Sequence, residues 1–204
     1  MALRLLVFDR TCIRRGLGLS TCWRGGAKLY GALGRIDASL GAASWDEALT
    51  WLSTVRKTEQ IVEIQYWGHG KWGSALLDGD ALDGTAFRDR HPHLPKLAAI
   101  RERMAPDALL WFRTCETFGA QRGVDFAKAC TGFFGARAAG HTHVIGYWQS
   151  GLRGLAPGHA PDWSPREGLE EGTPEEPRRA KGSSPTAPRT ITCLDGAVPA
   201  AWFA

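Results

Sequence analysis

Two residue types that can cooperate in nucleophilic chemistry follow two apolar runs of this 204-residue chain. His69 and Gly70 come shortly after the run 61–67, and Cys115 comes directly after the run 108–114, 46 positions downstream of His69. If both runs are neighbouring parallel strands, the imidazole and the thiol emerge together at the carboxyl edge of one sheet, where sites form in open α/β proteins. A thiol beside a base is a candidate nucleophile. The pair therefore predicts a Cys/His site.

The elements that must position this pair alternate along the chain. Ser44 followed by Glu47 forms a capping box at the start of a helix, and Gly and Asp-Gly in residues 71–80 predict a hairpin beside the site. Residues 11–34, rich in Gly, Arg and Cys, are expected to form a loop. The other expected elements are strands at 3–8, 61–67, 108–114 and 143–147 and helices at 93–104 and 121–134. Alternating strands and helices predict an α/β, three-layer sandwich with a mostly parallel central sheet flanked by helices.

The composition changes near the C-terminus. Residues 156–189 hold many Pro, Gly, Glu and Arg and almost no large apolar residues, so we expect a flexible segment that buries no core. Residues 190–194 resume a strand-like pattern, and Trp202 and Phe203 are candidates for docking on the body of the domain. We therefore expect one domain made of residues 1–155 and 190–204, with 156–189 as a flexible insertion.

The bulk numbers favour a globular protein. The apolar share is 44% and the formal charge is only +4, so neither a nucleic-acid nor a membrane partner is indicated. The five cysteines are odd in number and show no Cys-x-x-Cys pair, which argues against a disulfide framework or a zinc ribbon. No run approaches the roughly 20 apolar residues that span a bilayer, and the N-terminus is too short and interrupted for a signal peptide. We expect a cytoplasmic location.

The order of these features resembles the caspase-like cysteine peptidases, and the bacterial groups of that superfamily rather than the true caspases. The resemblance covers roughly residues 3–147 and rests on a strand followed by His69-Gly70, a hairpin, a helix, and a strand ending in Cys115. The His-to-Cys separation of 46 agrees with the roughly 50 of caspases. The local cysteine signature of caspases is absent, since Cys115 stands between Thr114 and Glu116.

The resemblance implies a cysteine endopeptidase with a catalytic dyad of His69 and Cys115, without a third carboxylate and without a cofactor or metal. It also implies that the backbone N–H groups of Gly70 and Cys115 stabilise the oxyanion. Independently, a helix following Cys115 would favour the thiolate through its N-terminal dipole. His69 would accept the thiol proton or later protonate the leaving amine.

By resemblance, the residue two positions before the cysteine lines the pocket for the side chain preceding the cut. That residue is Arg113, which predicts an acidic substrate side chain through bidentate pairing. Arg153, His141 and either Arg14 or Arg15 are expected to join it in binding a protein or peptide substrate. The acidic, exposed residues 170–176 are a candidate site for self-cleavage.

Two other functions fit parts of the sequence. The same cleft can bind a partner or peptide without catalysis, as an inactive caspase-like module. Alternatively, His141 and His143 share one face of a strand, and His91 and His93 repeat the spacing, so a metal-dependent hydrolase is a weaker candidate. The missing acidic or thiol ligands near these histidines favour a structural role for them. The sequence leaves the oligomeric state open.

Overall fold

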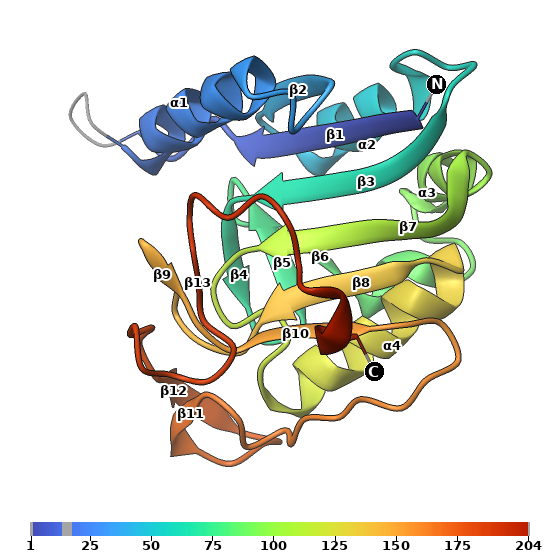
Figure 1. The fold of residues 1–204 in the computed structure, drawn as a ribbon. Helices are drawn as coiled ribbons and strands as arrows, with labels where there is room; N and C mark the ends of the chain where they lie inside the picture. The colour runs from blue at the N-terminus through green and yellow to red at the C-terminus, as the bar shows by residue number, and fades with distance from the viewer. Residues whose placement is uncertain (1, 14–17, 204) are drawn as a thin grey trace.

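A six-stranded, mostly parallel sheet forms the centre of the computed structural model, which describes residues 2–13 and 18–203. Five strands run parallel, and β10 alone is antiparallel to its neighbour β8 (Figure 1). In spatial order the strands are β10 (Leu152–Leu155), β8 (Arg137–His141), β7 (Met104–Arg113), β3 (Gln60–Trp67), β1 (Ala2–Asp9) and β2 (Ala38–Ala42). The α/β class and the mostly parallel sheet predicted from the sequence are confirmed.

Helices cover both faces of the sheet. The helices α2 (Trp45–Thr54), α3 (Leu94–Arg101) and α4 (Ala120–Phe134) bury apolar side chains in one core with strands β1, β3 and β7. On the other face, α1 (Leu19–Ala32) packs on β1 and β3, and the C-terminal segment covers β7 and β8 (Figure 1). Alternating side chains of β1 supply both faces, since Leu5 and Val7 join the first core and Leu6 and Phe8 the second.

Several predicted elements are present near their expected places. Strands β1, β3 and β7 and helix α4 match the apolar patterns, and α2 begins after Ser44, whose hydroxyl accepts from the Glu47 N–H at 3.2 Å. The predicted hairpin extends to three strands, β4 (His69–Lys71), β5 (Ser74–Leu77) and β6 (Asp80–Asp83). A 3-10 helix, η1 (Gly84–Phe87), follows it.

The expected loop at 11–34 is wrong, because most of it forms helix α1. Its N-cap Gly18 makes no side-chain cap bond, and three glycines lower its intrinsic helix propensity. Tertiary packing stabilises the helix instead, since it buries Ala27 and Tyr30 against the sheet. The short strand β2, which follows α1, was not predicted either.

The strand expected at 143–147 lies earlier, at β8 (Arg137–His141). Its Ala-Ala-Gly sequence lacks the β-branched and aromatic residues that mark strands. Small residues are needed there because a Cβ on Gly140 would lie 2.6 Å from the Phe118 ring. The segment after β8 contains the two-residue strand β9 (Trp148–Gln149), which pairs with β13 (Ile191–Thr192).

Residues 156–189 were expected to form a flexible segment without buried core residues, but the structure differs. They contain a hairpin of β11 (Leu169–Gly172) and β12 (Pro177–Ala180), and Trp163 enters the main core. The Trp163 indole donates to the Phe118 carbonyl at 3.1 Å and stacks on the Phe118 ring. One buried tryptophan thus attaches a polar segment to the domain. The C-terminal 3-10 helix η2 (Ala200–Trp202) and Phe203 pack on the sheet, as expected for Trp202 and Phe203.

Within residues 2–13 and 18–203, no helix combines the length and apolar character needed to cross a membrane.

Candidate active site

His69 and Cys115 reach one edge of the sheet because their strands are aligned neighbours. Strand β3 pairs in parallel with β7, and Trp67 lies opposite Arg113 in the register. His69 and Cys115 each follow two residues later, so the two strands deliver them to matching positions at the carboxyl edge. The strand order of the sheet is that of doubly wound proteins, and in this sheet the order reverses beside β1. In such sheets ligands bind at the carboxyl edge, next to the point of reversal.

Both residues line one cavity of about 450 Å³. Its walls come from α1, from the end of β3, from residues 145–149 and from the C-terminal segment at Cys193 and Leu194. Cys115 is partly exposed and His69 is exposed, so both are accessible from this space. The cavity therefore brings a thiol and an imidazole together within reach of a small molecule or peptide.

The thiol that contacts the imidazole is that of Cys12. The His69 Nε2 atom lies 3.3 Å from the Cys12 sulfur, and the rings of Trp23 and His69 form a T-shaped pair with centroids 5.6 Å apart. Cys12 follows β1, so the carboxyl ends of β1, β3 and β7 carry Cys12, His69 and Cys115 in spatial order. Cys12 was not among the predicted site residues, although it follows a strand end just as His69 and Cys115 do.

Cys115 has a different environment. Its sulfur accepts a hydrogen bond from the Ile145 N–H at 3.4 Å. Burial raises the pKa of the Cys115 thiol, and the nearby Glu116 carboxylate acts in the same direction, while the Ile145 N–H and Lys71 oppose the shift. The expected help from a helix dipole is not available at close range, because α4 begins at Ala120. The resting residue is therefore a neutral thiol.

Gly70 occupies a position that admits no side chain. A Cβ there would lie 2.2 Å from the Thr117 hydroxyl oxygen and 2.6 Å from the Cys115 carbonyl oxygen. The chain after β3 thus touches the turn after β7 through the glycine backbone. This contact couples the position of His69 to that of Cys115.

The turn after Cys115 is held in an unusual backbone conformation. Glu116 has a φ of 43°, a left-handed value that is costly for a residue with a side chain. Its N–H donates to the His143 carbonyl at 2.9 Å, and its buried carboxylate pairs with Lys71 at 3.1 Å. Strained conformations persist where neighbours over-determine them, and they cluster at functional sites.

Arg113 lines the cavity but is 4% exposed. Its Nε and Nη2 atoms donate to the Gln149 side-chain oxygen at 3.1 and 2.9 Å. Nη2 also donates to the Thr192 carbonyl at 3.2 Å, and Nη1 donates to the Tyr30 hydroxyl at 2.7 Å and the Asp195 carbonyl at 3.1 Å. These contacts engage all five N–H groups of the guanidinium, and every acceptor is neutral. Burial lowers the pKa of Arg113.

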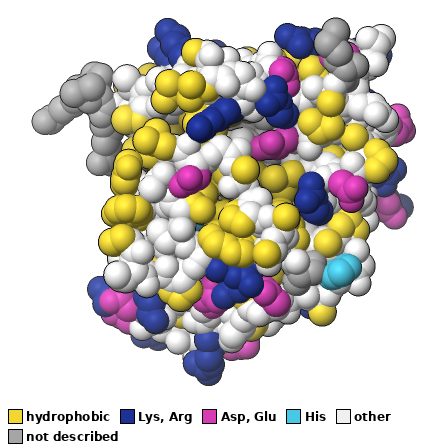
Figure 2. Space-filling view, in the orientation of Figure 1, with side chains coloured by type: hydrophobic (Ala, Val, Ile, Leu, Met, Phe, Trp, Pro, Cys, Tyr) yellow, Lys and Arg dark blue, Asp and Glu magenta, His cyan; other side chains and the backbone are white. Residues whose placement is uncertain are grey.

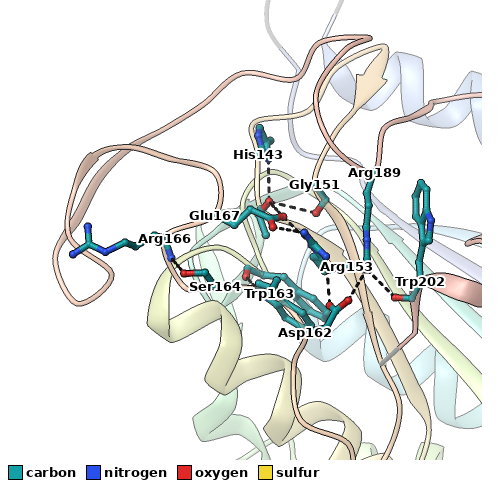
Figure 3. Close-up of polar contacts among 12 residues, drawn as sticks. His143, Gly151, Arg153, Asp162, Trp163, Ser164, Arg166, Glu167, Arg189 and Trp202 are labelled. Atoms are coloured by element: carbon teal, nitrogen blue, oxygen red, sulfur yellow. Dashed lines mark hydrogen bonds and ion pairs between the residues drawn. The ribbon is translucent and has the colours of Figure 1, made fainter.

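The structure does not bring Arg153 and His141 to the cavity that Cys115 lines. Arg153 lies between Glu167 and Asp162 in an ion-pair network, and Arg189 also contacts Asp162 (Figure 3). His141 is fully buried, donates from Nδ1 to the Ser150 carbonyl at 3.1 Å, and leaves Nε2 without a partner among the described residues. Arg14 and Arg15, also expected at the pocket, lie outside the described residues.

The histidine pairs lack the companions that a metal site needs. In the described part of the chain, no group of three or more His, Cys, Asp or Glu side chains is arranged to hold a metal ion. Burial lowers the pKa of His141 to about 3, and the pKa of His143 is also lowered by burial. The observed contacts of His141 and His143 are those of structural histidines.

Searches against protein-family models, curated proteins and solved structures found no match to this chain.

Proposed function

We propose that the protein is a cysteine endopeptidase of caspase-like type in which Cys115 is the nucleophile and His69 the base. The observation that carries the proposal is the delivery of both residues, by the paired strands β3 and β7, into one accessible cavity. The strained turn at Glu116 and the glycine contact at Gly70 add support, because both hold the thiol in a fixed place.

The proposed reaction starts from the neutral thiol. As the Cys115 sulfur attacks the substrate carbonyl carbon, its proton moves to His69, and the carbonyl oxygen becomes an oxyanion. In the caspase-like scheme the N–H groups of Gly70 and Cys115 stabilise that oxyanion, and each such donor contributes about 10²–10³ in rate. The C–N bond then breaks, protonated His69 gives its proton to the leaving amine, and water hydrolyses the thioester.

The contact between His69 and Cys12 raises the question of which thiol reacts. Cys115 is favoured because it lines the cavity with His69, whereas Cys12 is not among the described residues that line it. For catalysis the His69 ring has to turn from Cys12 towards Cys115, and its exposure leaves room for that rotation. Catalytic hydrogen bonds are often loose before substrate binds.

Single-cysteine variants test the proposal. A peptide-library digest, read by mass spectrometry, is expected to show cleavage by the wild type and by Cys12→Ala, and none by Cys115→Ala or His69→Ala. Cleavage that survives in Cys115→Ala and is lost in Cys12→Ala would transfer the nucleophile to Cys12. The same Cys115→Ala protein tests self-cleavage at residues 170–176, since only the wild type should lose intact mass.

A non-catalytic binding module is the second candidate. Two features favour it, because both work against attack on a carbonyl. The raised pKa of the Cys115 thiol lowers the thiolate fraction, and the His69 imidazole contacts Cys12 instead of Cys115. Such a module would bind peptides equally in the wild type and in Cys115→Ala without cleaving them. Rapid alkylation of Cys115 by a peptide acyloxymethyl ketone, lost in His69→Ala, would exclude it.

A further inference from the structure

The cavity beside Cys115 has a markedly apolar wall. Its large lining side chains include Leu19, Trp23, Leu29, Tyr30, Trp67 and Tyr147. Trp67 and Tyr30 meet edge to face, with ring centroids 5.0 Å apart, and Gly26 lets α1 approach Trp67, because a Cβ there would lie 2.6 Å from the indole. The helix and the strand thus form a fixed aromatic surface.

The rim of the cavity exposes apolar side chains to solvent. Leu19, Leu29, Tyr147 and Leu194 all line the cavity and are 44–56% exposed. Figure 2 shows hydrophobic side chains gathered along the left edge of the molecule, in the region between α1 and β9 of Figure 1. Contiguous exposed apolar surface marks a site that binds an apolar partner.

The charges around the cavity disfavour ionic substrate side chains. No Asp or Glu is found among its described lining residues, so a Lys or Arg side chain would meet the Arg113 cation without a counter-charge. An acidic side chain could reach Arg113 only by displacing one of its internal acceptors, since all five N–H groups are engaged. The carboxylate would also lose its water against an apolar wall.

We propose that this cavity binds a large apolar side chain, preferably an aromatic one, at the peptide residue that precedes the cut. The proposal rests on the cysteine peptidase function. The carbonyl carbon attacked by Cys115 must come within about 3.5 Å of the sulfur. The side chain of that same residue is therefore the one that enters a cavity adjoining the sulfur. In this arrangement Arg113 is an internal cation that anchors the C-terminal segment, in place of the acid-binding group expected from the sequence.

Peptide substrates that differ only at this position test the proposal. With the wild-type protein, Phe and Leu substrates are expected to be cleaved about 10–100-fold faster, as kcat/KM, than a Gly substrate, because their side chains are buried. Asp, Glu, Lys and Arg substrates should be no better than Gly. A preference for Asp or Glu, or for Lys or Arg, would overturn the proposal while leaving the peptidase function standing.

Two exposed leucines provide matched variants: Leu29 lies in α1, and Leu33 is the residue that follows its last turn. Leu29→Asp places a carboxylate on the cavity wall and should reduce the preference for Phe over Gly by at least fivefold. Leu33→Asp adds the same charge one turn later, outside the described lining, and should leave the preference unchanged. Equal effects of the two substitutions would refute the assignment of the cavity wall.

Binding without chemistry separates the two proposals. Fluorescein-labelled peptides with Phe, Gly or Asp at the test position are titrated into Cys115→Ala and followed by fluorescence polarisation. Tighter binding of the Phe peptide, lost in the additional Leu29→Asp variant, supports the cavity assignment even if the wild type cleaves nothing. Equal binding of all three peptides would reject it.

Discussion

At the scale of single residues, Cys115 and His69 share a cavity but have different partners. The imidazole contacts the sulfur of Cys12, and the thiol of Cys115 receives a backbone N–H from Ile145. Burial stabilises the neutral Cys115 thiol over the thiolate. The resting site therefore does not call for a thiolate–imidazolium ion pair. In the proposed peptidase reaction, the thiol proton would therefore be transferred during attack.

The pH dependence of alkylation tests this description of Cys115. A raised pKa lowers the thiolate fraction at any given pH, and only the thiolate reacts with iodoacetamide. The alkylation rate of Cys115, measured by peptide mapping, should therefore rise with pH and reach its midpoint above the roughly 8.5 of a free thiol. N-acetylcysteine serves as the reference. A fast plateau already present at pH 6 would indicate a resting thiolate–imidazolium pair instead.

Gly70 supports a second prediction at this scale. Gly70→Ala forces a methyl group against the Thr117 hydroxyl and the Cys115 carbonyl, so it should destabilise the protein by about 1–3 kcal/mol and abolish peptide cleavage. Gly132→Ala, in the interior of α4 with nothing within 4 Å of the added Cβ, should be neutral or slightly stabilising. Urea unfolding of both variants measures the difference. Equal stability of the two would mean that the close contact at Gly70 is absent.

At the scale of elements, local signals predict part of the fold. Strands β1, β3 and β7 were predictable because their apolar runs are continuous, and α2 because Ser44 and Glu47 mark its start. Helix α1 could not be predicted in this way, because Gly26 is unfavourable in an isolated helix and is explained only by the Trp67 ring that it touches. Strand β8 was misplaced for the same kind of reason. Gly140 is unfavourable in a strand by itself and is explained only by the Phe118 ring that packs against it.

The cap of α2 gives a prediction for one element. Ser44→Ala removes the hydroxyl that accepts from the Glu47 N–H, so the free energy of unfolding should fall by about 1 kcal/mol. Ser53→Ala changes the same residue type at the exposed C-terminal end of α2 and should alter stability by less than about 0.5 kcal/mol. Thermal and urea unfolding report both. Equal losses would show that the cap contributes nothing specific.

At the scale of the whole molecule, residues far apart in sequence meet around the site. Cys12, Tyr30, Arg113 and Asp195 belong to four separate segments, and their contacts join the sheet, α1 and the C-terminal segment. No local sequence pattern carries this information, so His69 and Cys115 could be selected from the sequence, whereas Arg113 was expected to bind the substrate. The partners that occupy its guanidinium come from positions 30, 149, 192 and 195.

Acid unfolding of the whole domain should depend on His141. Unfolded histidine binds a proton near pH 6.5, whereas burial lowers the pKa of His141 to about 3, so protonation favours unfolding. Stability should be complete above about pH 6.5 and fall as the pH decreases towards 3, by roughly 5 kcal/mol in total. His141→Asn, which keeps a donor for Ser150 but cannot ionise in this range, should show a shallower decline in urea titrations. Parallel declines would contradict a neutral, buried His141.

The hydroxyl of Tyr30 is the point where three distant segments join. It accepts from Arg113 at 2.7 Å and donates to the Asp195 carbonyl at 2.8 Å, so α1, β7 and the C-terminal segment meet at one oxygen. Tyr30→Phe keeps the ring against Trp67 but leaves a buried guanidinium N–H without its acceptor, which should cost about 1–3 kcal/mol of unfolding free energy.

Tyr147→Phe is the matched control, because Tyr147 is 56% exposed and its loss of a hydroxyl should change stability by less than about 0.5 kcal/mol. Tyr30→Phe should also weaken binding of the Phe peptide to Cys115→Ala, because Cys193 and Leu194, which line the cavity, lie in the turn that Tyr30 anchors. If Tyr30→Phe is as stable as Tyr147→Phe and binds the peptide with unchanged affinity, the C-terminal segment keeps its position without the hydrogen bonds of the Tyr30 hydroxyl. The cavity wall would then be held by Arg113, by the pairing of β13 with β9 and by the apolar cluster that contains Ile191 and Trp111.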